Sequence, residues 1–271
     1  MSVAGFFAGF AKVILGIILG ASLLTLIITS SFSQVTEYNV LKPMAVGIMN
    51  NSMGQGFSLN ESNFNEFKQM IDFECLGKDV FELPSGANNS MPISIKCDEL
   101  NNVTNAEQFK EIILSQLIDT VYYADYGCDD IVKCLKSGSQ SSQGLNAGPL
   151  VILSKTAHDS FAKYAMYCLI IVIVCAGLLL LFKPFSASLR GIGISFAIVG
   201  AGTFFIPGIK NLVLTKIIPP EAQQYISSIA TKIFSIVQKN FLIVFIMGIA
   251  LIIAGIVLGI VFKEKKPEKK K

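Results

Sequence analysis

The sequence predicts a mainly α-helical integral membrane protein with four transmembrane helices and a small disulfide-stapled α+β extracytoplasmic domain between the first and second helices. Three observations predict this class. Hydrophobic residues make up 52% of the 271 residues and charged residues only 15%, a balance outside the usual range of soluble domains. Four apolar runs are long enough, at about 1.5 Å per residue, to cross a hydrocarbon core of about 30 Å. Four cysteines lie in the one long polar segment.

The apolar runs set the order of the elements. They extend over residues 6–28, 164–182, 189–206 and 241–262. With their flanks they predict transmembrane helices at 1–33, 149–183, 189–207 and 240–262, a polar domain and loop at 34–148, a connector at 208–239 and a Lys-rich tail at 263–271. The third span has the weakest pattern, because four glycines dilute it and a Pro-Gly pair ends it: Gly191, Gly193, Gly200, Gly202 and Pro207-Gly208.

The first run has an alternative interpretation as a cleaved leader. Ser31 and Ser33 follow it, as small residues do before a signal-peptidase site. A leader typically has an apolar core of about 7–15 residues, whereas Lys12 is the only charged residue between Met1 and Gln34. We therefore expect a retained transmembrane helix; cleavage would leave three spans and a chain starting near Gln34.

The distribution of charge predicts the orientation. Lys183 and Arg190 lie in the short turn between the second and third spans, and the tail carries six more lysines: Lys263, Lys265, Lys266, Lys269, Lys270 and Lys271. The positive-inside rule predicts that both termini are cytoplasmic and that residues 34–148 and 208–239 lie on the extracytoplasmic side of the membrane, which we expect to be the cell membrane. The connector fits less well, because it carries four lysines against one glutamate. Residues 34–160 contain eight lysines and sixteen acidic residues, which gives a net charge of −8. This negative charge argues against nucleic-acid binding.

Cysteines and glycosylation acceptors support the same orientation. Cys75, Cys97, Cys128 and Cys134 form an even set, as in small domains of oxidising compartments. Four cysteines allow three pairings, and the short CDDIVKC loop favours Cys128 with Cys134 and hence Cys75 with Cys97. Asn-x-Ser/Thr acceptors for N-linked glycans fall in the same segment, although an Asn- and Ser-rich loop also produces them by chance: Asn50, Asn60, Asn88 and Asn102.

Local patterns predict the fold of the polar domain. Ser58 with Glu61 and Thr104 with Glu107 are capping-box pairs, each followed by apolar residues at helical spacing. Between these two helices the stretches DVFEL and PISIKC predict a short β-hairpin. The sequence KSGSQSSQGLNAGP then predicts a flexible loop. In the connector, apolar residues recur about every 3.5 residues from Tyr225 to Val237, which predicts an amphipathic helix that either lies at the interface or, as we prefer, continues into the fourth span as one rod.

The spans carry few groups for chemistry and many small residues. They contain no Asp, Glu or His, which argues against a proton-coupled carrier. His158 is the only histidine, so a His-based metal site or nucleophile is not expected within one chain, and no catalytic, cofactor or metal site is assigned. Small-residue pairs predict close helix packing, either inside the bundle or against another protomer: Gly5 with Gly9, Gly16 with Gly20, and Gly255 with Gly259.

These features favour a non-enzymatic membrane protein whose extracytoplasmic domain mediates self-assembly or partner binding, as a surface, assembly or adhesion component. Its partners would be the lipid bilayer and a second copy or another membrane or surface protein. An oligomeric channel or pore is the alternative, lined by hydroxyl groups of one span: Ser22, Thr25 and Thr29, or Ser195 and Thr203. An extracytoplasmic sensor is less favoured, because the chain shows no cytoplasmic output domain.

Overall fold

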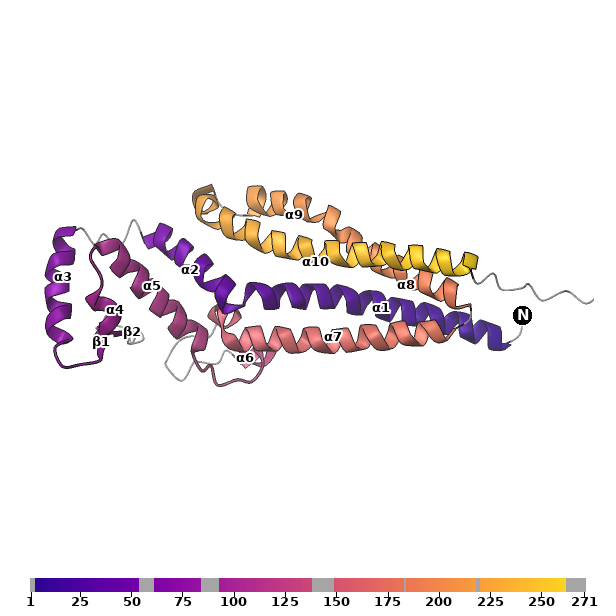
Figure 1. Ribbon diagram of the computed structural model, residues 1–271, viewed down its shortest axis with the longest axis horizontal. Coiled ribbons are helices and arrows are strands. Elements are labelled where there is room, and N and C mark those ends of the chain that lie inside the picture. Colours follow the sequence, from indigo (N-terminus) through magenta and orange to yellow (C-terminus); the bar gives the residue numbers. More distant parts are fainter. Residues whose placement is uncertain are drawn as a thin grey trace, which may run out of the picture. The chain divides into compact units, whose positions relative to one another are not determined.

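The computed structural model describes residues 3–53, 61–83, 93–137, 149–182, 184–217 and 220–261 (Figure 1). The chain divides into two compact units. Unit 1 combines residues Met1–Phe32, Phe161–Glu221 and Ala230–Lys271, and unit 2 combines Ser33–Ser160 and Ala222–Ile229. Most of unit 2, Ser33–Ser160, is therefore an insertion in the sequence of unit 1, and Ala222–Ile229 is a second, short one.

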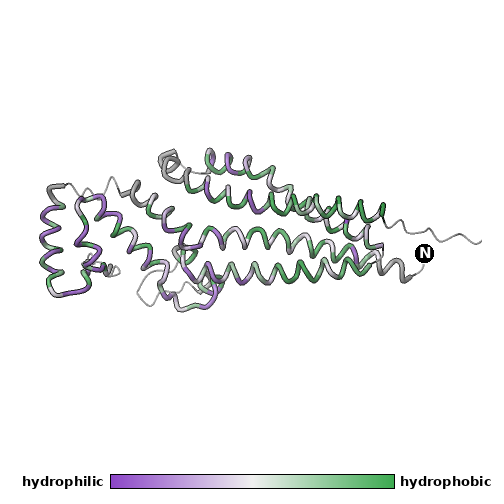
Figure 2. Tube along the Cα trace, in the orientation of Figure 1, coloured by the Kyte–Doolittle hydropathy of each residue, from purple (hydrophilic) through white to green (hydrophobic). Residues whose placement is uncertain are grey.

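Four helical segments are long and apolar enough to cross a membrane: Gly9–Val35, Lys155–Leu181, Phe185–Lys216 and Ile229–Val261. They belong to helices α1 (Val3–Val35), α7 (Lys155–Leu181), α8 (Phe185–Gly200) with its continuation, and α10 (Pro220–Val261). Figure 2 shows hydrophobic residues along all of them. At the level of length and composition, the prediction of four spanning helices is confirmed.

The helical segments of unit 1 share apolar contacts. One cluster joins α1, α7 and α8 through Leu19, Leu23, Val172, Cys175, Ile192 and Phe196. A second cluster joins Ile27 of α1 to Ile206 and Phe241. Close to it, the Asn240 amide donates a hydrogen bond of 2.9 Å to the Ser31 hydroxyl, which itself donates to the Ile27 carbonyl at 2.7 Å. The buried hydroxyl of Ser31 is thus satisfied on both sides.

The helical segment of the predicted third span continues beyond Pro207. After α8, a 3₁₀ turn (Ala201–Phe204), helix α9 (Ile206–Leu212) and a π-helical turn (Val213–Ile217) follow without a long interruption. Pro207 occupies the first turn of α9, where its missing N–H group has no intrahelical partner to lose. The helix also begins earlier than residue 189, at Phe185 after Pro184.

The fourth span confirms the preference for one continuous rod. Helix α10 runs from Pro220 to Val261 without a break between Gln238 and Phe241. The boundary expected at residue 240 therefore marks a change of composition along one helix. At the start of α7, residues Pro149–Leu153 form a 3₁₀ turn, and Ser154 then caps the helix by accepting a hydrogen bond from Ala157 N–H at 3.2 Å.

Unit 2 contains the two helices and the hairpin that the sequence predicts, together with three further helices. The predicted elements are α3 (Glu61–Glu74), α5 (Ala106–Tyr123), β1 (Val80–Leu83) and β2 (Ile93–Lys96), and the additional ones are α2 (Tyr38–Met53), α4 (Cys97–Asn101) and α6 (Ile131–Ser137). The strands are antiparallel, with Phe81 opposite Ile95. Phe81, Ile95 and Phe109 of α5 are almost fully buried in one core cluster, so the hairpin and α5 share a core.

The start of α5 corrects one detail. The sequence predicts Thr104 as the N-cap, whereas Asn105 occupies that position and its side chain accepts a hydrogen bond from Gln108 N–H at 2.8 Å. Gln108 in turn accepts hydrogen bonds from the backbone N–H and the hydroxyl of Thr104, both at 3.0 Å. The capping box is therefore present but shifted by one residue, because Asn and Gln fill the roles that we expected for Thr and Glu. Ser58, the other predicted cap, lies outside the described residues.

Candidate binding groove in the disulfide-stapled unit

A groove of about 750 Å³ lies in unit 2 between α2, α4 and α5. Val46 of α2, Val103 after α4 and Ile112 of α5 supply buried or half-buried apolar surface. Exposed polar groups surround them, among them Glu99 and Glu111. A largely apolar concavity with a few polar groups at its margin is the usual form of a binding site.

One wall of the groove is fixed by a polar cluster of Tyr38, Lys42 and Asp119. The Tyr38 hydroxyl donates to Asp119 Oδ1 at 2.5 Å. Lys42 Nζ lies 2.6 Å from the Tyr38 oxygen, and 3.0 and 3.1 Å from the two carboxylate oxygens of Asp119. The Lys42 ammonium also sits 5.1 Å from the centroid of the Tyr38 ring. These contacts connect α2 to α5 across 77 residues of sequence.

Apolar packing beside this cluster holds the same two helices together. Leu41 of α2 is buried against Ile118 and Tyr122 of α5. The Tyr38 ring lies 5.3 Å from the Tyr122 ring and 5.6 Å from the Tyr123 ring, between centroids. Tilted aromatic pairs at such distances contribute about 0.5–1.5 kcal/mol each beyond their buried area. The two helices that supply most of the groove lining are therefore held together by apolar as well as polar contacts.

The electrostatic character of the groove follows from this pairing. The one lysine in its lining, Lys42, is already engaged with Asp119. Glu99 and Glu111 are exposed at the margin, so the groove presents negative charge around an apolar floor. This distribution suits a ligand with apolar side chains flanked by positive ones.

The cluster predicts a loss of stability at alkaline pH. Burial and the hydrogen bond to Asp119 raise the pKa of Tyr38. Desolvation alone would lower the pKa of Lys42, but its hydrogen bonds to Tyr38 and Asp119 and the Asp119 charge raise it overall. The folded state therefore favours the neutral Tyr38 phenol and the Lys42 ammonium more than the unfolded state does. Their contribution to the free energy of unfolding is complete below about pH 10 and is lost as the pH rises through the raised pKa values of the folded state.

Asp119→Asn tests this expectation. We expect the variant to lower the free energy of unfolding by about 1 kcal/mol at pH 8, because the ion pair is about one quarter exposed and partly screened. The difference from the wild type should shrink above about pH 10, as measured by thermal unfolding at a series of pH values. Glu74→Gln, which breaks the more exposed Glu74–Lys78 pair, is the control and should change stability little. If the difference in stability between Asp119→Asn and the wild type stays constant up to pH 11, the Tyr38–Lys42–Asp119 cluster does not cause the alkaline loss of stability.

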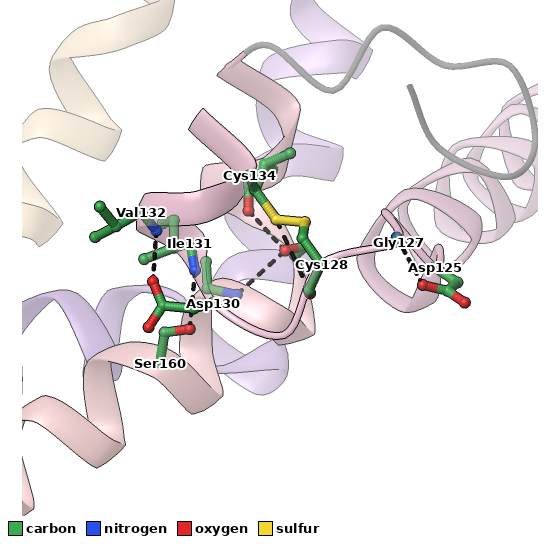
Figure 3. Close-up of a disulfide and its surroundings, with 11 residues drawn as sticks. Asp125, Gly127, Cys128, Asp130, Ile131, Val132, Cys134 and Ser160 are labelled. Atoms are coloured by element: carbon green, nitrogen blue, oxygen red, sulfur yellow. Dashed lines mark hydrogen bonds between the residues drawn. A yellow bond between two sulfur atoms is a disulfide. The ribbon is translucent and has the colours of Figure 1, made fainter. Parts of the chain in front are cut away.

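Both predicted disulfides are present in unit 2. Cys75 pairs with Cys97, joining the end of α3 to the start of α4, and Cys128 pairs with Cys134. Figure 3 shows the second disulfide with its surroundings: Ile131 N–H donates to the Ser160 hydroxyl at 3.2 Å, and Val132 N–H donates to Asp130 Oδ1 at 2.7 Å. The small loop is thus attached to the first turns of α7 within unit 2.

The remaining predicted polar residues are scattered. Among the glycan acceptors, Asn102 lines the groove, is exposed, and donates from its amide to the Asp98 carbonyl at 3.2 Å. Asn50 lies in α2, whereas Asn60 and Asn88 fall outside the described residues. His158 Nδ1 lies 2.9 Å from the Ser33 carbonyl oxygen, so this nitrogen carries the proton. In the described part of the chain no three His, Cys, Asp or Glu side chains gather as a metal site would require.

The small-residue pairs divide into two groups. A methyl group added at Gly9, Gly16 or Gly20 would meet nothing within 4 Å, so these residues of α1 do not pack closely within the described chain. The bulky Leu19 and Leu23 make the α1 contacts instead. The environment of the Gly5 side-chain position lies outside the description.

Gly255 packs closely against α8, and Gly259 is in ordinary contact with it. A methyl group at Gly255 would lie 3.0 Å from Arg190 N and 3.1 Å from the Ser186 carbonyl, and one at Gly259 would lie 3.5 Å from the Ser186 hydroxyl. The same seam contains three glycines that we did not identify as packing residues: Gly193, Gly200 and Gly248. Together with Ala197 in α8 and with Ile252 and Gly255 in α10, these glycines are spaced alternately four and three residues apart. This heptad spacing in two apolar segments is the sequence pattern that could have predicted their packing.

Four of the five hydroxyl groups considered for a pore donate to backbone carbonyls, three of them within their own helix. Thr25 donates to the Ala21 carbonyl at 3.0 Å, Thr29 to the Thr25 carbonyl at 2.8 Å, and Ser195 to the Gly191 carbonyl at 3.2 Å. Thr203 donates to the Gln238 carbonyl of α10 at 3.4 Å. Such bonds satisfy a hydroxyl in an apolar surrounding without a water-filled path.

Comparisons of the chain with protein-family models, with curated proteins and with solved structures give no match. The groove and its surroundings therefore carry the functional argument.

Proposed function

We propose that the chain is a non-enzymatic integral membrane protein whose unit 2 lies outside the cytoplasm and binds a partner polypeptide in the α2–α4–α5 groove. The groove is the observation that carries this proposal: about 750 Å³, open to solvent, apolar at its floor and acidic at its margin. The positive-inside rule and the two disulfides support the orientation.

The partner is expected to insert apolar side chains between Val46 and Ile112 and to place basic side chains near Glu99 and Glu111. A second copy of the chain is the other occupant to consider. It would bring a second polar segment of net charge −8, and the repulsion between the two segments disfavours that choice at low ionic strength.

Obstruction of the groove tests the proposal. Gly47 lines the groove, and a Cβ added there would meet nothing within 4 Å, so Gly47→Trp is the substitution that places a bulky side chain at the groove. We expect loss of the complex that the wild-type protein forms in its native membrane, measured by native electrophoresis after extraction in lipid nanodiscs. Gln69→Trp, at an exposed position of α3 outside the groove, is the matched control and should leave the complex intact.

Deletion of residues 39–149 is a second test of the same proposal. It should abolish the same complex while the four apolar helices still insert into the membrane. Complexes that persist after both changes would contradict the proposal. Native mass spectrometry of the purified protein under non-reducing conditions then addresses the alternative, because a closed ring of five or more copies would favour the channel and make conductance the next measurement.

A further inference from the structure

The outer edge of strand β1 has no hydrogen-bonding partner among the residues that the structure describes. In the register of the hairpin Phe81 faces Ile95, and Cys97 N–H donates to the Asp79 carbonyl at 3.0 Å. Backbone groups in an antiparallel ladder alternate in direction, so Phe81 bonds to β2 whereas Val80 and Glu82 direct their N–H and C=O groups away from it. Among the described residues no hydrogen bond reaches those outward groups. Edges of this kind can accept a further strand.

A second groove, of about 530 Å³, runs beside this edge, between β1 and the C-terminal half of α3. It is lined by Met70, Glu74, Lys78, Val80, Phe81 and Glu82 and shares no residue with the α2–α4–α5 groove. A helix beside a free strand edge is the arrangement in which extended peptides bind by strand addition, with backbone bonds to the edge and side chains in the groove.

The surface around the edge is apolar and acidic. Met70 and Val80 are 42% and 40% exposed, and Phe73 and Leu76 near the end of α3 are 73% and 77% exposed. Met70 and Val80 share the lining of the groove, and exposed apolar surface outside a membrane segment often marks an interaction site. Lys78 is paired with Glu74 at 2.7 Å and also attracts the nearby carboxylate of Glu82. The carboxylates of Glu82, Asp79 and Asp72 are exposed and form no ion pair within 4 Å in the described part of the chain.

We propose that β1 binds an extended, basic peptide segment of a partner protein as a third strand. The segment pairs its backbone with the outward N–H and C=O groups of Val80 and Glu82 and places apolar side chains against Met70 and Val80. Its lysine or arginine side chains lie near Glu82 and Asp79. Pairing with β1 of a second copy is disfavoured, because it would bring two acidic edges together.

A defined peptide tests this inference on the full-length protein in nanodiscs of neutral phosphatidylcholine, which do not attract a basic peptide. The probe is a fluorescein-labelled peptide of alternating lysine and valine, seven residues long, and binding is measured by fluorescence anisotropy. A second peptide of the same sequence carries N-methyl groups on all its backbone amides, which keeps its charge and removes its backbone donors. We expect the methylated peptide to bind about tenfold more weakly or worse.

Substitutions in β1 test the same hydrogen bonds from the side of the protein. Val80→Pro removes an N–H group that the hairpin does not use, a position where an edge strand tolerates proline, and should weaken binding about tenfold. Ser94→Pro makes the same change on β2, whose Ser94 N–H also faces away from the ladder, and should leave binding unchanged. Glu82→Lys should weaken binding of the lysine peptide and strengthen binding of a glutamate–valine peptide. This variant keeps every backbone N–H group, so it tests the site even if the proline variants disrupt the strand.

Three outcomes would overturn the inference. Equal binding of the methylated and unmethylated peptides would show attraction by charge alone. Equal effects of Val80→Pro and Ser94→Pro would separate binding from the β1 edge. A dimer of the wild-type protein that Val80→Pro abolishes, without peptide binding, would identify a second copy as the occupant. Gly47→Trp should leave peptide binding unchanged, so failure of this test and failure of the groove proposal can be told apart.

Discussion

Gly200→Ala is expected to lower the stability of the helical unit by about 3 kcal/mol, because the added methyl group would lie against the backbone of α10. Its carbon would be 2.5 Å from Phe245 Cα, and a backbone atom cannot move aside without displacing the helix. Across the same seam, a methyl group at Gly193 would lie 2.8 Å from the Gly248 carbonyl oxygen. Reversible unfolding in mixed detergent micelles, followed by far-ultraviolet circular dichroism, measures the loss.

Gly20→Ala is the matched control for this prediction. It makes the same substitution in a spanning helix, at a position where the methyl group meets nothing within 4 Å. We expect a change within about 1 kcal/mol, in the stabilising direction, because alanine has the higher helix propensity. A large destabilisation at Gly20, or none at Gly200, would show that the glycines of α1 rather than those of α8 mediate helix packing.

Removal of the Cys75–Cys97 disulfide is expected to destabilise unit 2 by about 3 kcal/mol. The bond closes a loop with a sequence separation of 22 residues, and the chain-entropy relation gives about 3 kcal/mol for a loop of this length. Cys97 also belongs to the core cluster around Phe81 and Phe109, and the partly buried Cys75 packs against it, so the bond fixes the end of α3 to this core. The variant is Cys75→Ala with Cys97→Ala, measured by urea unfolding under non-reducing conditions.

The second disulfide supplies the comparison. Cys128 and Cys134 are separated by only six residues, for which the same relation gives about 2 kcal/mol. Cys128→Ala with Cys134→Ala should therefore cost less, and its effect should concentrate on α6 in hydrogen exchange. Equal losses from the two double variants would show that loop length does not govern the stabilisation.

Elements with strong local patterns could be predicted from the sequence. Alternation of Ile93 and Ile95 defined a strand, and apolar residues at helical spacing defined α3 and α5. Helix α2 was missed because Pro43 lies inside it and its apolar residues form no clear stripe. Its position depends on the packing of Leu41 against α5, a long-range contact that local propensity does not contain.

The candidate site shows the same limit. The local sequence YNVLK contains both Tyr38 and Lys42, but nothing in it identifies Asp119, 77 residues beyond Lys42, as their partner. The glycines of the third span illustrate the opposite error: they weakened its hydropathy pattern, yet Gly193 and Gly200 are the residues that let α8 approach α10. A hydropathy average treats glycine as neutral, whereas helix packing in a membrane depends on its small size.

The insertion of unit 2 into the sequence of unit 1 has a consequence for synthesis. The contacts of α1 through Leu19 and Leu23 require residues beyond Phe161, which are made only after the intervening segment Ser33–Ser160. At a translation rate of about 5–20 residues per second, α1 waits for roughly ten seconds before its neighbours exist. During that interval the whole segment Ser33–Ser160, with both pairs of cysteines, is synthesised before the residues that pack against α1 in unit 1. The order of synthesis thus makes unit 2 available for folding before the contacts of α1 can form.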